Sequence, residues 1–186
     1  MRAFETEKTE VAEIDRSVYD IKDKVNAAFE VNSGLTAEIV EQISKEKHDP
    51  DWMREFRLKA LDIYNKASIP NWGPSLEGLD MRNIVTYVRP NTEMRGKWSE
   101  VPDDIKNTFE RLGIPQAERS SLAGVGAQYD SEVVYHNVKE EVAAQGVVYT
   151  DMESAIKGEY ADMVRKYFMK LVTPHDHKFA ALHGAV

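Results

Sequence analysis

The sequence predicts a mainly α-helical protein, of α+β type with only a few short strands. Three segments repeat apolar residues every three or four positions, which places those residues on one face of a helix. These segments are residues 35–43, 52–67 and 160–171. Apolar runs of strand length are fewer and shorter, and they lie at 84–88, 133–135 and 147–149. At 186 residues, the chain is long enough to bury a hydrophobic core without disulfides.

Composition excludes several classes of function. The chain has 32 acidic and 24 basic side chains and a formal charge of −8, so it should repel a phosphate backbone, and we expect no nucleic acid partner. It contains no cysteine, which excludes a thiolate nucleophile, a thiolate zinc site and a cysteine-ligated cluster within this segment. No apolar run approaches the roughly 20 residues that cross a membrane. The first ten residues lack the apolar stretch of a signal peptide, so we expect a cytoplasmic protein without a membrane partner.

Residues 1–33 are predicted to form an N-terminal arm that is poorly ordered. Its apolar residues recur at spacings of three and four from Ile14 to Phe29, which is typical of one helical stripe. The same stretch is rich in β-branched residues and ends at Gly34, so an extended arm that orders only against a partner is an alternative. Residues 34–186 are then predicted to form a single helical domain.

The first part of this domain predicts two core-facing helices. In the first, Glu41 and Lys45 are placed to pair on the solvent side. Asp49 is predicted to cap the second helix, with Pro50 in its first turn. The apolar stripe of the first helix is Leu35, Ile39, Val40 and Ile43, and that of the second is Trp52, Met53, Phe56, Ala60, Ile63, Tyr64 and Ala67.

The middle of the chain predicts an irregular connection, a strand and a helix. Prolines and glycines are frequent over residues 69–80, which indicates the connection, and 84–88 fits a short strand. Pro102 suits a first helical turn, and Gly113 suits a helix end, so the third helix is expected over 102–112.

The last third predicts a mixture of short elements. Val138 and Val142 indicate a helix that ends at Gly146, although the run at 133–135 just before it fits a strand. Thr150 and Glu153 have the spacing of a capping box. The stripe that follows predicts a helix ending before Pro174, and its members are Tyr160, Val164, Tyr167, Phe168 and Leu171.

Two patterns suggest nucleotide or acid–base chemistry, but each has a simpler interpretation. Gly124 and Gly126 resemble the start of a phosphate-binding loop, yet the third glycine would fall at Tyr129 and no strand is expected before the pair. A flexible turn is the better interpretation. His136, with Asp130 and Glu132 upstream, has the residue types of an acid–base set, but no nucleophile accompanies it.

A third pattern suggests a metal site. His175, His177 and His183, with Asp176, have side chains that bind divalent metals. Their spacing matches no zinc pattern, and a polar loop after a proline usually carries solvated side chains. We therefore predict no catalytic, cofactor-binding or metal-binding residue in this chain, and no enzyme activity.

Several stretches of the sequence resemble the N-terminal part of the SufB family. The most specific are SEVPDDIKNTFERLGIP from Ser99, SLAGVGAQYDSEVVYHNVKEE from Ser121 and KFAALHGAV from Lys178. IDRSVYDIKD from Ile14, GLTAEIV from Gly34, WMREFRLKAL from Trp52 and WGPSLEGLD from Trp72 resemble it as well, so the similarity covers essentially the whole chain.

The resemblance implies a scaffold subunit of the SUF iron–sulfur cluster assembly machinery. Such a subunit works with the ATPase SufC and the paralogue SufD, receives sulfur from a sulfur-donor protein and builds a nascent cluster. In that family a helical N-terminal region precedes a right-handed parallel β-helix, which is absent here. The cysteine and acidic residues associated with the cluster lie beyond the position of Val186, so none can be assigned to this sequence.

We therefore expect a non-catalytic structural and docking region, truncated before the β-helix and binding no cofactor itself. An independent helical adaptor and a histidine-based metal-dependent enzyme are the alternatives. His177 and His183 stand where the family pattern has asparagine, which disfavours the enzyme. The mostly apolar residues 178–186 are expected to be exposed, because in the family the β-helix that would cover them follows immediately.

Overall fold

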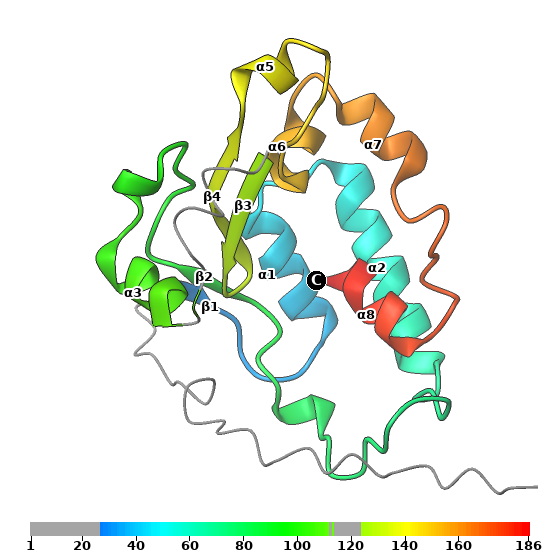
Figure 1. The fold of residues 1–186 in the computed structure, drawn as a ribbon. Helices are drawn as coiled ribbons and strands as arrows, with labels where there is room; N and C mark the ends of the chain where they lie inside the picture. Colours follow the sequence, from blue (N-terminus) through cyan, green and yellow to red (C-terminus); the bar gives the residue numbers. More distant parts are fainter. Residues whose placement is uncertain (1–26, 112, 114–123) are drawn as a thin grey trace, which may run out of the picture.

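The computed structural model describes residues 27–111, 113 and 124–186 (Figure 1). Helices dominate the described residues, which confirms the predicted fold class, and the strands form two separate antiparallel pairs, β1 with β2 and β3 with β4. Two of the short helices, η2 and η3, are of 3₁₀ type. The elements in chain order are β1 (Ala27–Glu30), α1 (Ala37–Glu46), α2 (Asp51–Lys66), η2 (Met81–Asn83), β2 (Val88–Pro90), η3 (Trp98–Glu100), α3 (Asp103–Arg111), β3 (Gly124–Tyr129), β4 (Glu132–Val138), α5 (Glu140–Ala143), α6 (Met152–Lys157), α7 (Ala161–Tyr167) and α8 (Lys178–Ala185).

Most of the predicted N-terminal arm lies outside the described residues. Its last part is an extended segment, because Phe29 belongs to β1 and not to a helix. Val31 is 3% exposed, and its backbone N–H donates to the carbonyl of Tyr87 at 3.2 Å. The domain boundary after residue 33 stays a prediction.

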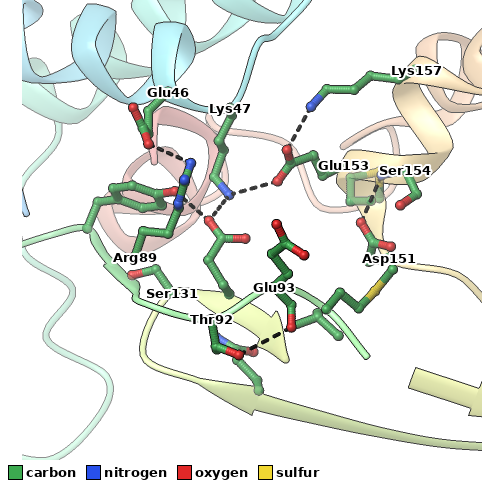
Figure 2. Close-up of a pocket in the computed structure, with 16 residues that line it drawn as sticks. Glu46, Lys47, Arg89, Thr92, Glu93, Ser131, Asp151, Glu153, Ser154 and Lys157 are labelled. Carbon is green, nitrogen blue, oxygen red and sulfur yellow. Dashed lines mark hydrogen bonds and ion pairs between the residues drawn. The ribbon is translucent and has the colours of Figure 1, made fainter. Parts of the chain in front are cut away.

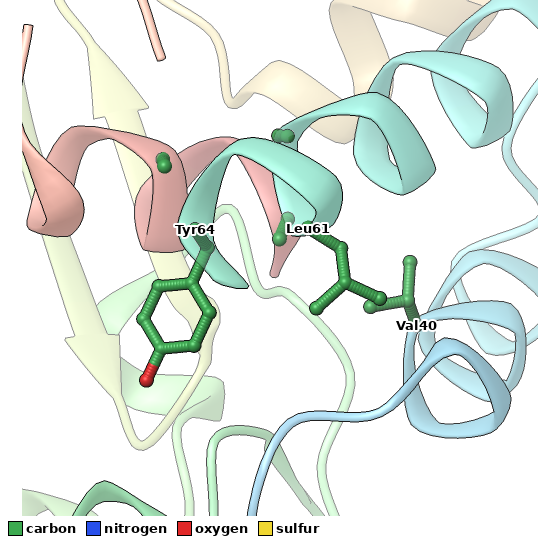
Figure 3. Packing of buried hydrophobic residues seen from close by; sticks show 6 residues of the cluster. Val40, Leu61 and Tyr64 are labelled. Atoms are coloured by element: carbon green, nitrogen blue, oxygen red, sulfur yellow. The ribbon is translucent and has the colours of Figure 1, made fainter. Parts of the chain in front are cut away.

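The helical core forms where α1, α2 and α8 meet. Figure 3 shows Leu61 of α2 pointing toward Val40 of α1 in this cluster. Its buried members are Val40, Ala60, Leu61, Tyr64, Ala181 and Ala185. A Cβ added to Gly184 would lie 3.1 Å from the Cβ of Ala60, so glycine permits the close approach of α8 to α2. The alanines of α8 are therefore covered within this domain, while Phe179 and Leu182 are only half-buried, so the predicted need of residues 178–186 for a further cover is met in part.

A buried ion pair fixes the corner between α1 and α2. The Asp49 carboxylate accepts a hydrogen bond from Nε of Arg57 at 2.6 Å, and the two side chains are 0% and 9% exposed. This pairing replaces the predicted capping role of Asp49, because α2 starts after Pro50 without a side-chain cap. Glu41 likewise pairs with Arg54 at 2.8 Å instead of the predicted Lys45.

A second, smaller core lies between α3 and the β3–β4 hairpin. Trp98 packs edge-to-face against Tyr135 and Phe109, at ring distances of 5.3 and 5.6 Å. The buried residues around them are Val101, Ile105, Ala127, Val134 and Tyr135. The predicted helix at 102–112 is confirmed over Asp103–Arg111, and residue 112 lies outside the described residues.

The short elements follow the prediction only in part. The strand expected at 84–88 starts only at Val88, and before it Val85 makes an isolated bridge to Ser33. The strand interpretation of 133–135 is correct, since β4 runs to Val138 and leaves only a short helix α5 after it. Residues 147–149 form no strand and are exposed. Asp151, not Thr150, caps α6 through a hydrogen bond from the Ser154 N–H at 2.8 Å.

The helix expected over 160–171 is shorter than predicted and does not face the core. α7 ends at Tyr167 and contains no buried residue. Phe168 turns inward and packs edge-to-face on Phe56 at 5.1 Å, while Met169 has a φ of 46°. A positive φ at a non-glycine residue is unfavourable in a helix, so the helix cannot continue through this point. No helix within the described residues is both long and apolar enough to cross a membrane.

We expect the Asp49→Ala variant to lose about 3–5 kcal/mol of unfolding free energy, because it leaves the buried Arg57 guanidinium without its counter-charge. Urea denaturation would measure the loss. Asp62→Ala is the matched control, since Asp62 pairs with Lys66 at 2.6 Å but both side chains are more than half exposed. Its effect should stay within about 0.5 kcal/mol. Equal stability of the two variants would show that the buried pair does not stabilise the corner.

Candidate functional site

A pocket lined by many charged side chains lies where the end of α1, β2, the β3–β4 hairpin and α6 come together. It has a volume of about 440 Å³. Figure 2 shows side chains from these elements gathered around it, among them Lys47, Arg89 and Glu153. Its lining residues include Glu46, Lys47, Tyr87, Arg89, Thr92, Glu93, Ser131, Glu132, Asp151, Glu153, Ser154 and Lys157.

Lys47, the residue that follows α1, is central to this pocket. Its Nζ lies 2.8 Å from Oε1 of Glu132 on β4 and 3.8 Å from Oε2 of Glu153 on α6 (Figure 2). The side chains of Lys47 and Glu132 are only 16% and 19% exposed. Lys47 therefore joins three elements through one partly buried ammonium group.

Tyr87 completes the arrangement around Glu132. Its hydroxyl donates a short hydrogen bond to Oε1 of Glu132, the same oxygen that Lys47 contacts. Burial raises the pKa of Tyr87 well above its usual value, and the hydrogen bond and negative charge of Glu132 raise it further. Tyr87 is therefore a neutral donor at any physiological pH, and it cannot serve as a general base there.

The remaining charges at the rim are mostly paired with each other. Arg89 lies 2.5 Å from Glu46, and Lys157 lies 2.7 Å from Glu153. Burial alone would raise the pKa of Asp151, but hydrogen bonds from Ser154 and the nearby His136 outweigh it and lower that pKa. Asp151 is therefore ionised at neutral pH, as its capping role requires.

The chemistry of this pocket is that of a structural junction. Its cations are neutralised by neighbouring carboxylates, and its lining holds neither cysteine nor histidine. Among the described residues, no group of three or more histidine, cysteine, aspartate or glutamate side chains is placed to hold a metal ion. The ion pairs of Lys47 thus join segments that are 85 residues apart, at Glu132, and more distant still in sequence, at Glu153.

Gly124 and Gly126 lie inside strand β3, not in the turn that the sequence suggests. Tyr149 covers this part of the strand, and a Cβ added to Gly126 would lie 2.8 Å from its hydroxyl oxygen. A side chain at position 126 would therefore displace the tyrosine. The glycines permit the packing of an aromatic ring against the strand, and no phosphate loop forms.

His136 lies in β4. It does not form the acid–base set with Asp130 and Glu132 that the sequence suggests. Its ring stacks at 4.6 Å on Tyr149, and its Nε2 is buried without a hydrogen-bond partner. Glu132 instead belongs to the junction with Lys47, and Asp130 occupies the hairpin turn with a φ of 52°. The acidic neighbour of His136 is Asp151, which lies 15 positions later in the chain and which no pattern in the sequence links to it.

The three C-terminal histidines do not form a metal site. Nδ1 of His177 accepts a hydrogen bond from the Ala180 N–H at 3.1 Å, which makes His177 the cap of α8. His183 lines the same groove as His177, while His175 lies against α2 in another pocket. The carboxylate of Asp176 accepts a hydrogen bond from the Thr173 N–H at 2.7 Å. These residues therefore shape the chain around α8.

Comparison with known proteins gives relatives but no structural counterpart. The chain is 49% identical over 168 residues to the iron–sulfur cluster assembly protein SufB of Bacillus subtilis. It is 46% and 45% identical, over the same length, to iron–sulfur cluster assembly SufBD family proteins of Staphylococcus epidermidis and Staphylococcus haemolyticus. Each match covers 90% of this chain and 36% of the relative, so the chain spans about a third of its relatives' length. No protein-family model and no solved structure matches it.

We expect Tyr87→Phe to destabilise the protein by about 1.5–3 kcal/mol, because the change removes a hydrogen bond to a charged carboxylate. Since the folded pKa of Tyr87 is raised above the unfolded value of about 10, its contribution is complete below that pH and declines as the pH rises above it. The stability difference between the wild type and Tyr87→Phe should therefore shrink from pH 9 to pH 11, as measured by chemical denaturation. The exposed Tyr167→Phe provides the control, and a constant difference across this range would contradict the assignment.

Proposed function

Over the 168 matched residues this chain belongs to the SufBD family of iron–sulfur cluster assembly proteins, and we propose that it acts there as a non-catalytic structural and docking region. The identity of 49% to a protein named SufB is the observation that carries this proposal. In this role the chain supplies a folded unit and a protein surface, and the chemistry of cluster formation takes place elsewhere in the assembly.

The described residues support a structural role. The polar pocket uses its cations in ion pairs with Glu46, Glu132 and Glu153, so they are not free to hold a substrate. The sequence has no cysteine with which to bind iron or carry sulfur. A cluster, as the product of the assembly, would therefore need ligands from outside these 186 residues.

Exposed apolar side chains support a docking role. Large hydrophobic residues on a monomer surface are common singly, but a group of them marks an interaction site. Several lie along α7 and the segment after it, namely Met163, Tyr167, Leu171 and Val172. The partners we propose, through the full-length family member, are subunits of the SufC and SufD type and a sulfur-donor protein, in the cytoplasm.

The alternatives receive less support. A histidine-based enzyme would require His175, His177 and His183 to converge, and His175 lies in a different pocket. An independent adaptor would use the same exposed surface without the other SUF subunits. Binding measurements therefore separate it from the proposed function.

We expect the purified chain to form no stable cluster after anaerobic incubation with ferrous iron, sulfide and reductant, because it lacks thiolate ligands. Iron analysis and visible absorbance after desalting would measure this outcome. In parallel, isothermal titration calorimetry against purified SufC- and SufD-type subunits should detect binding to at least one of them. Stoichiometric iron that survives desalting would contradict the non-catalytic role, and the absence of binding to both subunits would contradict the docking role.

A further inference from the structure

The surface of α7 is patterned for burial but is not buried. The sequence gives it the apolar stripe of a core-facing helix, yet Tyr167 of that stripe is 61% exposed, and Met163, outside the stripe, is 59% exposed. The stripe continues beyond the helix, where Leu171 is 98% exposed and Val172 58% exposed. Leaving such side chains in water forgoes the hydrophobic free energy of covering them, so this surface is suited to a partner.

The core holds this surface in place. Phe168 packs edge-to-face against both Trp52 and Phe56 of α2, at ring distances of 6.3 and 5.1 Å. Met169 packs against α8, because a Cβ added to Gly184 of that helix would lie 3.1 Å from the Met169 sulfur. These two inward anchors separate Tyr167 from Leu171, so the chain on both sides of them faces outward. A surface anchored in this way is largely formed before a partner arrives.

A groove of about 430 Å³ lies between this segment and α8. No aspartate or glutamate lines it, although the whole chain carries a charge of −8. Its lining residues are Tyr167, Met169, Lys170, Leu171, Val172, His177, Phe179, Ala180 and His183. We call it the α7–α8 groove.

The charges at this groove are basic and unpaired. Lys170 lines the groove, and Arg165 and Lys166 occupy the last turn of α7. Across the described parts of the chain, none of the ion pairs involves Arg165, Lys166 or Lys170. The ammonium of Lys166 lies 5.0 Å above the Tyr167 ring, so it stays close to the apolar stripe. Asp162 lies one helical turn before Arg165 and Lys166 but forms no described ion pair with either of them, and Asp176 accepts a hydrogen bond from a backbone N–H.

We propose that the α7–α8 groove binds an acidic amphipathic helix of a partner protein. The apolar face of that helix would cover Tyr167, Leu171 and Val172, and its carboxylates would meet the unpaired cations. This proposal rests on the docking role given above and specifies the surface and the kind of partner. Charge complementarity selects an acidic partner, because a basic one would meet Lys170 in the groove, no acidic lining residue, and two further cations on the adjoining last turn of α7.

A labelled peptide tests the groove directly. The probe is a fluorescent, roughly 18-residue helical peptide with leucine at positions i, i+3, i+4 and i+7 and glutamate at most other positions. Its matched control carries lysine in place of every glutamate. Fluorescence anisotropy should show that the glutamate peptide binds at least about tenfold tighter than the lysine peptide, and that added salt weakens its binding. Equal binding of the two peptides would overturn the proposal.

Variants of exposed residues locate the binding site. The triple change Arg165→Glu, Lys166→Glu and Lys170→Glu should weaken binding of the glutamate peptide by more than about tenfold. Leu171→Ser should weaken it by about fivefold. Lys59→Glu is the matched control, because Lys59 is exposed on α2 outside the groove, and it should leave binding unchanged. Circular dichroism would verify that all variants fold. A triple variant that binds like the wild type would place the peptide elsewhere and overturn the proposal.

Two further measurements distinguish this proposal from self-association of the chain and from the proposed docking role. If sedimentation shows dimers that Leu171→Ser abolishes, a second copy of the chain is the occupant and the acidic partner is wrong. If SufC- or SufD-type subunits bind the wild type and the triple variant equally, the docking role stands and the groove assignment fails. If the acidic peptide binds in the groove and neither subunit binds the chain, the groove stands and the proposed function fails.

Discussion

The buried ion pair between Arg57 and Asp49 determines how the two halves of this structure meet. Only Lys47, His48 and Asp49 come between the end of α1 and Pro50, and His48 adopts a φ of 52°. Because Arg57 holds Asp49 below the surface of α2, the path of this short turn is fixed. That path directs Lys47 toward the hairpin, where it meets Glu132 at 2.8 Å. One buried charge pair therefore positions a second, partly buried one.

The two polar features of the molecule have opposite electrostatic character. At the junction around Lys47, both signs of charge are present, and the short distances satisfy them within the protein. At the α7–α8 groove, only cations are present and none of the described ion pairs involves them. The first site stabilises the fold through its ion pairs, and the second is the site at which we propose that a partner binds. Whether its charges are paired within the protein therefore distinguishes a structural polar site from a candidate binding site better than the exposure of its side chains does.

The elements that the sequence predicted best are those whose signals are local. The helices α1, α2 and α3 follow from apolar periodicity and from residues such as Pro102 that favour a helix start. The junction could not be predicted, because Tyr87 and Glu132 are 45 residues apart and nothing in either neighbourhood identifies the other. The periodic stripe at 160–171 misled for a different reason. Periodicity predicts that a helix has an apolar face, but it does not predict whether that face packs against the same chain or against a partner. The glycines at 124 and 126 were misassigned as a turn. The ring of Tyr149 packs in the space that side chains at these positions would fill, but Tyr149 lies more than twenty residues away in the sequence.

The packing of α8 on α2 has a consequence for how the chain folds during synthesis. Lys178 of α8 donates hydrogen bonds to the carbonyls of Tyr64 and Ala67 at the end of α2, across 114 and 111 residues of sequence. At roughly 5–20 residues per second, a ribosome takes on the order of 6 to 23 s to span that interval. For this time the apolar side of α2 has left the ribosome without its final neighbour. This part of the fold is therefore complete only after α8 has been synthesised, and until then the apolar side of α2 lacks the small residues of α8 that cover it.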